Sequence, residues 1–201
     1  VNEAFIGTGI KFKNFSLGVN TGYLFGKKNY DNRLSFKSDT TNDYRTHYGT
    51  ETNFGGVFLD AGVQYVAKLK KGALRFGAYS TIQKKYHASR NNLVETFDYN
   101  PGTGAPQPID TVSYNGDQKG KVQLPATFGG GLTYSNDHFL LGADYETTQW
   151  SKYRFFDETD IVQNSWIAKF GMQYLPASPG AEGYFNYVKY RAGFSIGQDY
   201  I

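Results

Sequence analysis

The sequence predicts an all-β protein, an antiparallel transmembrane β-barrel. Apolar and polar side chains alternate along segments longer than the five or six residues typical of soluble strands, and helical periodicity is poor throughout. The connections alternate between short turns and long loops, which is typical of membrane barrels with short periplasmic turns and long extracellular loops. About eight strands are expected, at residues 3–12, 15–25, 54–69, 72–87, 120–135, 138–150, 162–175 and 185–198.

The first four expected strands each carry one apolar face. Every odd position of 57–69 is apolar, whereas Asp60 and Lys68 lie at even positions. The same separation runs through 15–25 and 72–87. Segments of this length suit the crossing of a bilayer, which takes about 9–11 residues at a tilt of about 45°.

The last four expected strands repeat the pattern. In 120–135 no bulky apolar group falls on the second face of the strand. The apolar face of these four strands includes Phe128, Leu132, Phe139, Leu141, Trp166, Phe170, Tyr190 and Phe194. Their second face is rich in glycine and polar residues. We therefore expect one continuous apolar surface across the whole sheet.

Aromatic residues indicate which face points outward. Tyrosine and tryptophan gather near the expected strand ends, at Tyr23, Tyr65, Tyr134, Trp150, Trp166, Tyr174 and Tyr187. Such positions are typical of the aromatic girdles of membrane barrels, and the small residues of the second face suit a crowded lumen. These features favour an integral protein of the bacterial outer membrane with its apolar face toward membrane lipid. The alternative is a soluble ligand-binding barrel with its apolar face inside.

The connections give each strand a direction. Long extracellular loops are expected at 26–53, 88–119 and 151–161, and 176–183 is expected as a periplasmic turn. Following these directions places both ends of the chain outside the cell, so we expect a segment of a larger barrel. Long loops are also suited to docking other outer-membrane proteins, which gives a second functional hypothesis: a non-transporting barrel subunit, or scaffold, of a larger outer-membrane complex.

Five short motifs follow one another in the second half of the chain. They are LPATFGGGLTY at 124–134, LGADY at 141–145, QWSKY at 149–153, KFGMQY at 169–174 and YRAGF at 190–194. Their order resembles the later barrel half of the FadL-type long-chain fatty acid transporter family. The resemblance implies a fourteen-stranded barrel with an N-terminal hatch, and passive uptake of hydrophobic small molecules such as long-chain fatty acids. The hatch and the closing strand of that family have no counterpart here, so no ligand site is carried over.

Ionisable residues on the polar face are the candidates for ligand contacts. They are Asp60, Lys68, Arg75, Asp144, Glu146, Lys169, Lys189 and Arg191. A cationic side chain in a partly dry lumen binds a carboxylate well, which makes Arg75, Lys169 and Arg191 the ligand-binding candidates. The simpler interpretation, which we favour, is an internal network in which acids and bases neutralise one another across neighbouring strands.

Composition argues against several other classes. A net charge of +3 without long basic runs predicts no nucleic-acid partner, and the absence of cysteine excludes a disulfide scaffold. The three histidines lack metal-ligand spacing, so no metal and no cofactor is expected. Asp39, Asp43 and Glu51 offer carboxylates for a calcium ion, but a solvated polar loop is the simpler interpretation.

One tripeptide raises an enzymatic alternative. His87-Ala88-Ser89 resembles the histidine–x–serine pair of outer-membrane phospholipase, but Arg90 replaces the expected asparagine. The alternation also places His87 on the lumen face, with Arg75 and Tyr79, whereas lipid hydrolysis needs the outward face. We therefore expect no enzymatic activity.

Overall fold

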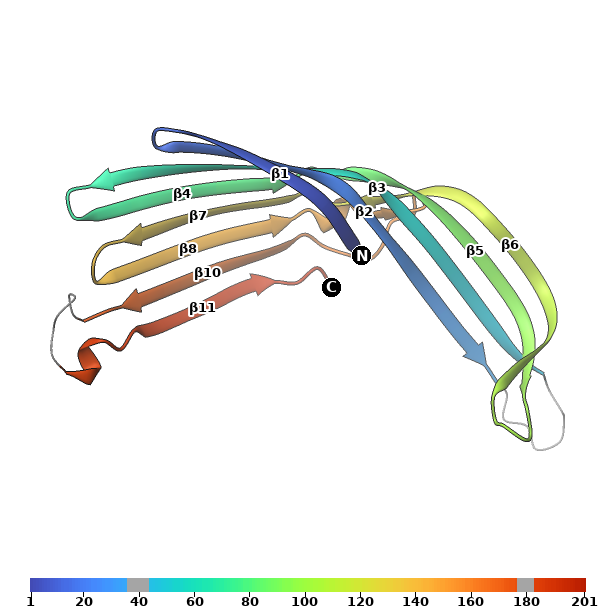
Figure 1. Cartoon of the computed structure of the whole chain (residues 1–201). Coiled ribbons are helices and arrows are strands. Elements are labelled where there is room, and N and C mark those ends of the chain that lie inside the picture. The colour runs from blue at the N-terminus through green and yellow to red at the C-terminus, as the bar shows by residue number, and fades with distance from the viewer. Residues whose placement is uncertain (36–43, 177–182) are drawn as a thin grey trace.

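The protein is described by a computed structural model of residues 1–35, 44–176 and 183–201. Eleven strands form one antiparallel sheet with almost no helix (Figure 1). The strands are β1 (Asn2–Phe12), β2 (Phe15–Leu34), β3 (Arg45–Leu69), β4 (Gly72–Thr81), β5 (Lys84–Tyr99), β6 (Pro106–Leu124), β7 (Thr127–Ser135), β8 (Phe139–Thr148), β9 (Arg154–Phe155), β10 (Ser165–Tyr174) and β11 (Tyr190–Gln198). Two short 3-10 helices are η1 (Trp150–Lys152) and η2 (Tyr184–Asn186). Within the described ranges, no helix has the length and apolar character needed to span a membrane.

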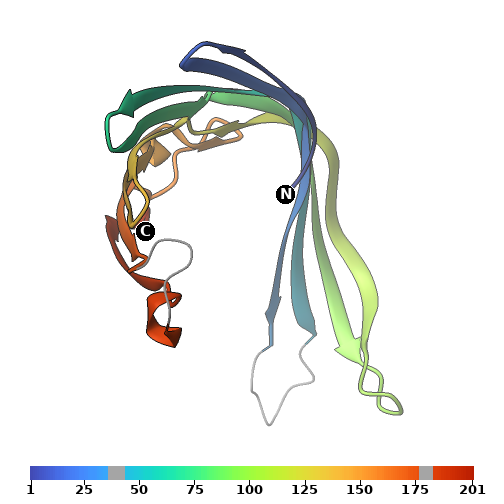
Figure 2. The same ribbon diagram turned by 60° about the vertical axis from the view of Figure 1, so that its left-hand side comes forward.

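The sheet has two parts that share β2 and β3. The first part, called the wall, runs in the order β1-β2-β3-β4-β7-β8-β10-β11. The second part, called the arm, consists of 26–34 of β2, 45–55 of β3, and the whole of β5 and β6. Figures 1 and 2 show the arm bending away from the wall toward the side on which the wall is concave.

The expected barrel is present only as an open sheet. In the described part of the chain, β1 pairs with β2 alone and β11 pairs with β10 alone, so the wall does not close on itself. The prediction of an all-β antiparallel fold is confirmed. The eight strands of the wall each run beside a neighbour in continuous antiparallel register.

The arm occupies segments that the sequence predicted as loops. β2 continues to Leu34 and β3 begins at Arg45, so much of 26–53 is a paired hairpin. Likewise β5 and β6 fill most of 88–119. Both faces of these strands carry polar residues, so a period of two in hydrophobicity does not mark them.

The expected strands 72–87 and 120–135 are each interrupted where the arm leaves the wall. On β3, Asp60 faces Thr81 but Gly55 faces His87, so five steps along β3 correspond to six along its partner. This single extra residue is a β-bulge, and it exchanges the two faces of the following strand. Opposite it, β6 ends before Pro125, which lacks a backbone N–H for the ladder.

The third expected loop, 151–161, begins within η1 and contains β9, which pairs with β6 over two residues. At the other end of the wall, β11 begins at Tyr190 rather than at 185, because η2 intervenes. The predicted periplasmic turn 176–183 lies largely outside the described residues.

A small core forms inside the corner between wall and arm. Leu24, Phe58 and Tyr86 are buried there, with Phe54 and Leu124 packed against them. They lie on β2 and β3, which pass through the corner, and on the adjoining ends of β5 and β6. Their burial, rather than a second sheet, therefore fixes the angle of the arm.

Candidate functional site

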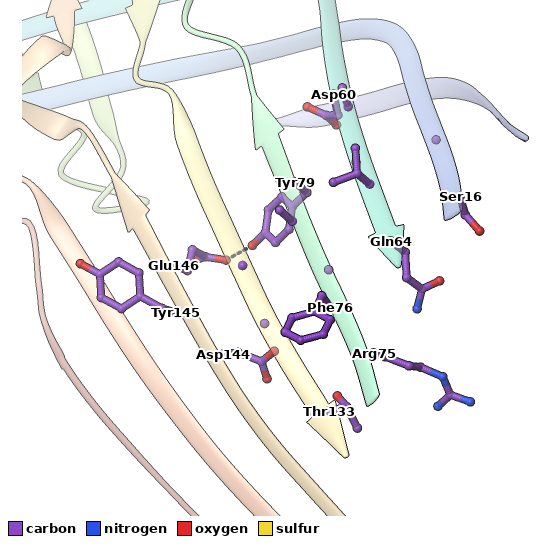
Figure 3. A pocket seen from close by; sticks show the side chains of 18 of the residues that line it. Ser16, Asp60, Gln64, Arg75, Phe76, Tyr79, Thr133, Asp144, Tyr145 and Glu146 are labelled. Atoms are coloured by element: carbon purple, nitrogen blue, oxygen red, sulfur yellow. Dashed lines mark hydrogen bonds between the residues drawn. The ribbon is translucent and has the colours of Figure 1, made fainter. Parts of the chain in front are cut away.

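A polar hollow of about 820 Å³ lies against the concave face of the wall (Figure 3). Its charged and aromatic lining comes from four strands, β3, β4, β8 and β10, and β2 and β7 add uncharged residues. Asp60, Asp144 and Glu146 supply carboxylates, and the Tyr79 hydroxyl donates a hydrogen bond to Glu146. The face that alternation marked as polar is therefore the concave face.

The three predicted ligand residues do not share one site. Arg75 and Lys169 line the hollow. Arg191 lies on β11 outside it, and its Nε donates a hydrogen bond of 2.8 Å to Oε1 of Gln173 on β10. The structure brings two of the candidates to one surface and leaves the third at the edge of the sheet.

The hollow does not contain the predicted network of ion pairs. In the described part of the chain no salt bridge joins Asp60, Arg75, Asp144 or Lys169 to another side chain. Lys169 and Asp144 are opposite each other in the register of β10 and β8, yet they form no ion pair. One carboxylate oxygen of Asp60 is buried without a hydrogen-bond partner in that part of the chain. Charged groups of both signs therefore line the hollow without neutralising one another in ion pairs.

The convex face of the wall is a continuous exposed apolar surface. Leu59 is 40% exposed, Phe128 44% and Phe194 66%, so these side chains do not gather in a closed core. The same face includes Phe15, Leu17, Val19, Val63, Phe76, Leu132, Leu141, Phe170 and Met172. Exposed apolar area on this scale indicates contact with lipid or with another protein.

The apolar surface ends where the arm begins. On the outer face of β2 the last apolar side chain is Phe25, and Lys27 follows two residues later. Lys27 Nζ lies 2.7 Å from a carboxylate oxygen of Glu51 on β3. On the outer face of β2, the last apolar side chain and the first charged one are thus neighbours, two residues apart.

His47 joins three strands of the arm. Its Nδ1 lies 2.8 Å from Oε1 of Glu95 on β5, and its Nε2 lies 3.0 Å from Oδ1 of Asp31 on β2. The hydrogen bond to Glu95 raises the pKa of His47; burial acts against this, and the hydrogen bond to Asp31 adds to it. Because both ring nitrogens face carboxylates, the doubly protonated imidazolium is the form that satisfies the site.

The segment that carries η1 and β9 packs against the inner face of the arm. The ammonium of Lys28 lies 4.8 Å from the ring centre of Phe155, and the guanidinium of Arg90 lies 4.4 Å from that of Phe156. A Cβ on Gly120 would lie 2.2 Å from the Phe156 ring, so only glycine fits there. This segment ties the arm to the end of β8 by cation–π contacts.

The metal and enzyme alternatives gain no support from the structure. Asp39 and Asp43 lie outside the described residues, and Glu51 is engaged by Lys27. Among the described side chains, no group of three or more metal-ligating residues has a suitable geometry.

The structure corrects the position of His87. The β-bulge places His87 on the outer face, opposite Lys121, and not on the lumen side. Ser89 Oγ donates a hydrogen bond of 2.9 Å to Asp117 Oδ1. Among the described residues, His87 and Ser89 are not hydrogen-bonded to each other, and Ser89 is bonded to Asp117 instead.

Sequence reasoning missed the arm and its ion pairs. The available signal was charge rather than hydrophobicity. Lys27, Asp31 and Arg33 lie on the outer face of 26–34, and the acids Glu51 and Glu95 occur on β3 and β5. Cross-strand pairs of opposite charge are typical of exposed hairpins.

Comparison with known proteins identifies the family. The family model that matches is BamG, over residues 1–201, while a search of curated proteins finds no match. This result overturns the resemblance to the FadL-type transporters and the fatty-acid transport it implied. BamG is a family associated with the Bam complex, the assembly complex of the bacterial outer membrane. With a match along its whole length, the chain belongs to the BamG family.

Proposed function

We propose that this protein is an integral subunit of the outer-membrane Bam complex and acts as a scaffold rather than as a channel. In this proposal the wall lies in the membrane with its convex face against lipid tails. The arm projects from the membrane on the side of the long hairpins and offers a polar surface to other subunits. The proposal includes no catalytic step.

The observation that carries the proposal is the length of the apolar band. On the outer face of β2 the band runs from Phe15 to Phe25, with the charged arm beginning at Lys27. A tilted transmembrane strand needs about 9–11 residues to cross the hydrocarbon core. The apolar part of β2 therefore matches one membrane crossing, and the remainder of the strand reaches beyond it.

The charged lining of the hollow is unfavourable for binding an acyl chain, which supports the scaffold role. The lining carries ionisable groups of both signs, including Asp60, Arg75, Asp144 and Lys169. Burying a hydrocarbon chain against them would remove water from unpaired charges, which is strongly unfavourable. A polar, water-filled interior is the state that such a lining stabilises.

Two measurements test the proposal. Membranes containing the tagged full-length protein are washed with alkaline carbonate, and the protein should stay in the membrane pellet. The detergent-solubilised protein is then purified by its tag, and other Bam subunits should be recovered in constant ratio to it. Release by carbonate would refute membrane insertion, and purification without Bam subunits would refute the scaffold role.

A further inference from the structure

Basic side chains gather on the outer face where β5 and β6 leave the wall. His87 is opposite Lys121 in the register, Lys85 lies two residues before His87, and Lys119 lies two residues before Lys121. All four side chains are exposed. They point outward because the bulge between β4 and β5 shifts the alternation by one residue. We call Lys85, His87, Lys119 and Lys121 the basic rim.

Acidic neighbours neutralise only part of this charge. Asp117 bonds both Lys119 and Ser89, and Glu51 is paired with Lys27 on the neighbouring strands. In the described part of the chain, Lys85 and Lys121 have no acidic partner. The rim therefore presents an excess of positive charge at the surface.

The rim directly borders the apolar band. Ile82, in the break between β4 and β5, is 53% exposed, and Val57 on β3 is 51% exposed. Two residues beyond Val57, Gly55 is paired with His87 of the rim. An apolar surface followed at once by unpaired lysines matches the layering of a bilayer, in which anionic headgroups lie just outside the hydrocarbon.

We propose that Lys85 and Lys121 bind the phosphate groups of anionic membrane lipids. The proposal rests on the membrane insertion of the wall. Lipid is favoured over an acidic protein surface because the lysines follow the apolar boundary of the sheet. Their attraction to headgroups would fix the depth and tilt of the wall, since the arm bends away at this level (Figure 1).

The test compares two charge-matched double variants of the full-length protein. Lys85→Gln/Lys121→Gln removes the unpaired charges of the rim. Lys70→Gln/Lys71→Gln removes two lysines from the exposed turn between β3 and β4, at the opposite end of the wall. Each protein, in detergent, is titrated with phosphatidylglycerol or with phosphatidylcholine, and bound lipid is counted by native mass spectrometry.

The rim variant should bind the first phosphatidylglycerol about fivefold more weakly for each lysine removed. Its binding of phosphatidylcholine, and the phosphatidylglycerol affinity of the turn variant, should match the wild type. Wild-type affinity of the rim variant, or an equal loss in both variants, would overturn the proposal. Loss of co-purifying Bam subunits from the rim variant with unchanged lipid affinity would assign the rim to a protein partner instead.

Flotation with phosphatidylcholine vesicles separates this proposal from the one it rests on. If the wild type does not insert into these neutral vesicles, the membrane role of the wall fails. If it inserts but shows no preference for phosphatidylglycerol, the proposed role of the rim alone is refuted.

Discussion

The orientation of the wall can be tested with an arginine placed on each of its two faces at one depth. Val19 lies near the middle of the apolar part of β2, is 42% exposed and points outward. Asn20, the next residue, lines the hollow and is opposite Asp60 on β3. Val19→Arg and Asn20→Arg therefore introduce the same charge at one depth, on opposite faces.

The expected magnitudes differ widely. An arginine on the lipid face near the bilayer midplane lowers the free energy of unfolding by about 2–4 kcal/mol. At the edge of the band the cost falls to about 0–1 kcal/mol, so Phe25→Arg should be mild. For Asn20→Arg we expect little change, because the new guanidinium faces the hollow and the carboxylate of Asp60.

The assay is reversible urea unfolding in phospholipid vesicles, followed by tryptophan fluorescence from Trp150 and Trp166. Similar unfolding free energies for Val19→Arg and the wild type would refute a lipid-facing convex surface. A larger loss for Asn20→Arg than for Val19→Arg would reverse the assignment of the two faces. Circular dichroism of each variant before unfolding verifies that the sheet has formed.

Three further predictions concern the arm. The pKa of His47 is raised in the folded protein, so the contribution of His47 to stability is complete below the unfolded pKa of about 6.5 and is lost as the pH rises through the folded pKa. The urea midpoint of the wild type should therefore fall over this pH range, and His47→Gln should make that fall shallower. An unchanged pH profile in the variant would contradict the bridge to Glu95. Gly120→Val should displace the Phe156 ring and expose the segment that carries η1 and β9 to protease, whereas an unchanged cleavage pattern would contradict the packing. Phe58→Ala should lower the free energy of unfolding by about 3–5 kcal/mol, because Phe58 is 4% exposed in the corner core; a loss below about 1 kcal/mol would show that this core does not hold the arm.

The wall could be predicted from the sequence because its chemistry repeats every second residue. Val57 to Leu69 and Phe15 to Phe25 have one apolar and one largely polar face, and the structure shows both as strands with these faces on opposite sides. The hollow follows from the same alternation, because the polar face of these strands is the concave face, on which Arg75 and Lys169 lie.

The arm could not be predicted in this way. Thr46, Thr50 and Thr52 alternate with charged or polar residues rather than with apolar ones, so neither face of β3 stands out there. What holds these strands together is backbone pairing and ion pairs between distant segments, and their register cannot be read from one strand alone. The bulge beside Ile82 adds a second obstacle, because it reverses the faces without leaving a glycine or proline in that strand as a signal.

The mistaken family resemblance also follows from the difference between the wall and the arm. Four of the five motifs that suggested the transporters lie mainly in β7, β8, β10 and β11, where glycine and polar residues on the concave face alternate with apolar residues on the convex face, and the fifth, QWSKY, lies in η1. Any sheet with one face toward lipid and the other toward a polar interior imposes that pattern, whatever it does. The function of such a sheet is instead decided by what is added to the wall, as function resides in sites carried on a fold. Here the additions are the arm, its charged outer face and the segment bound beneath it, and these parts present a polar protein surface rather than a path for a hydrophobic molecule.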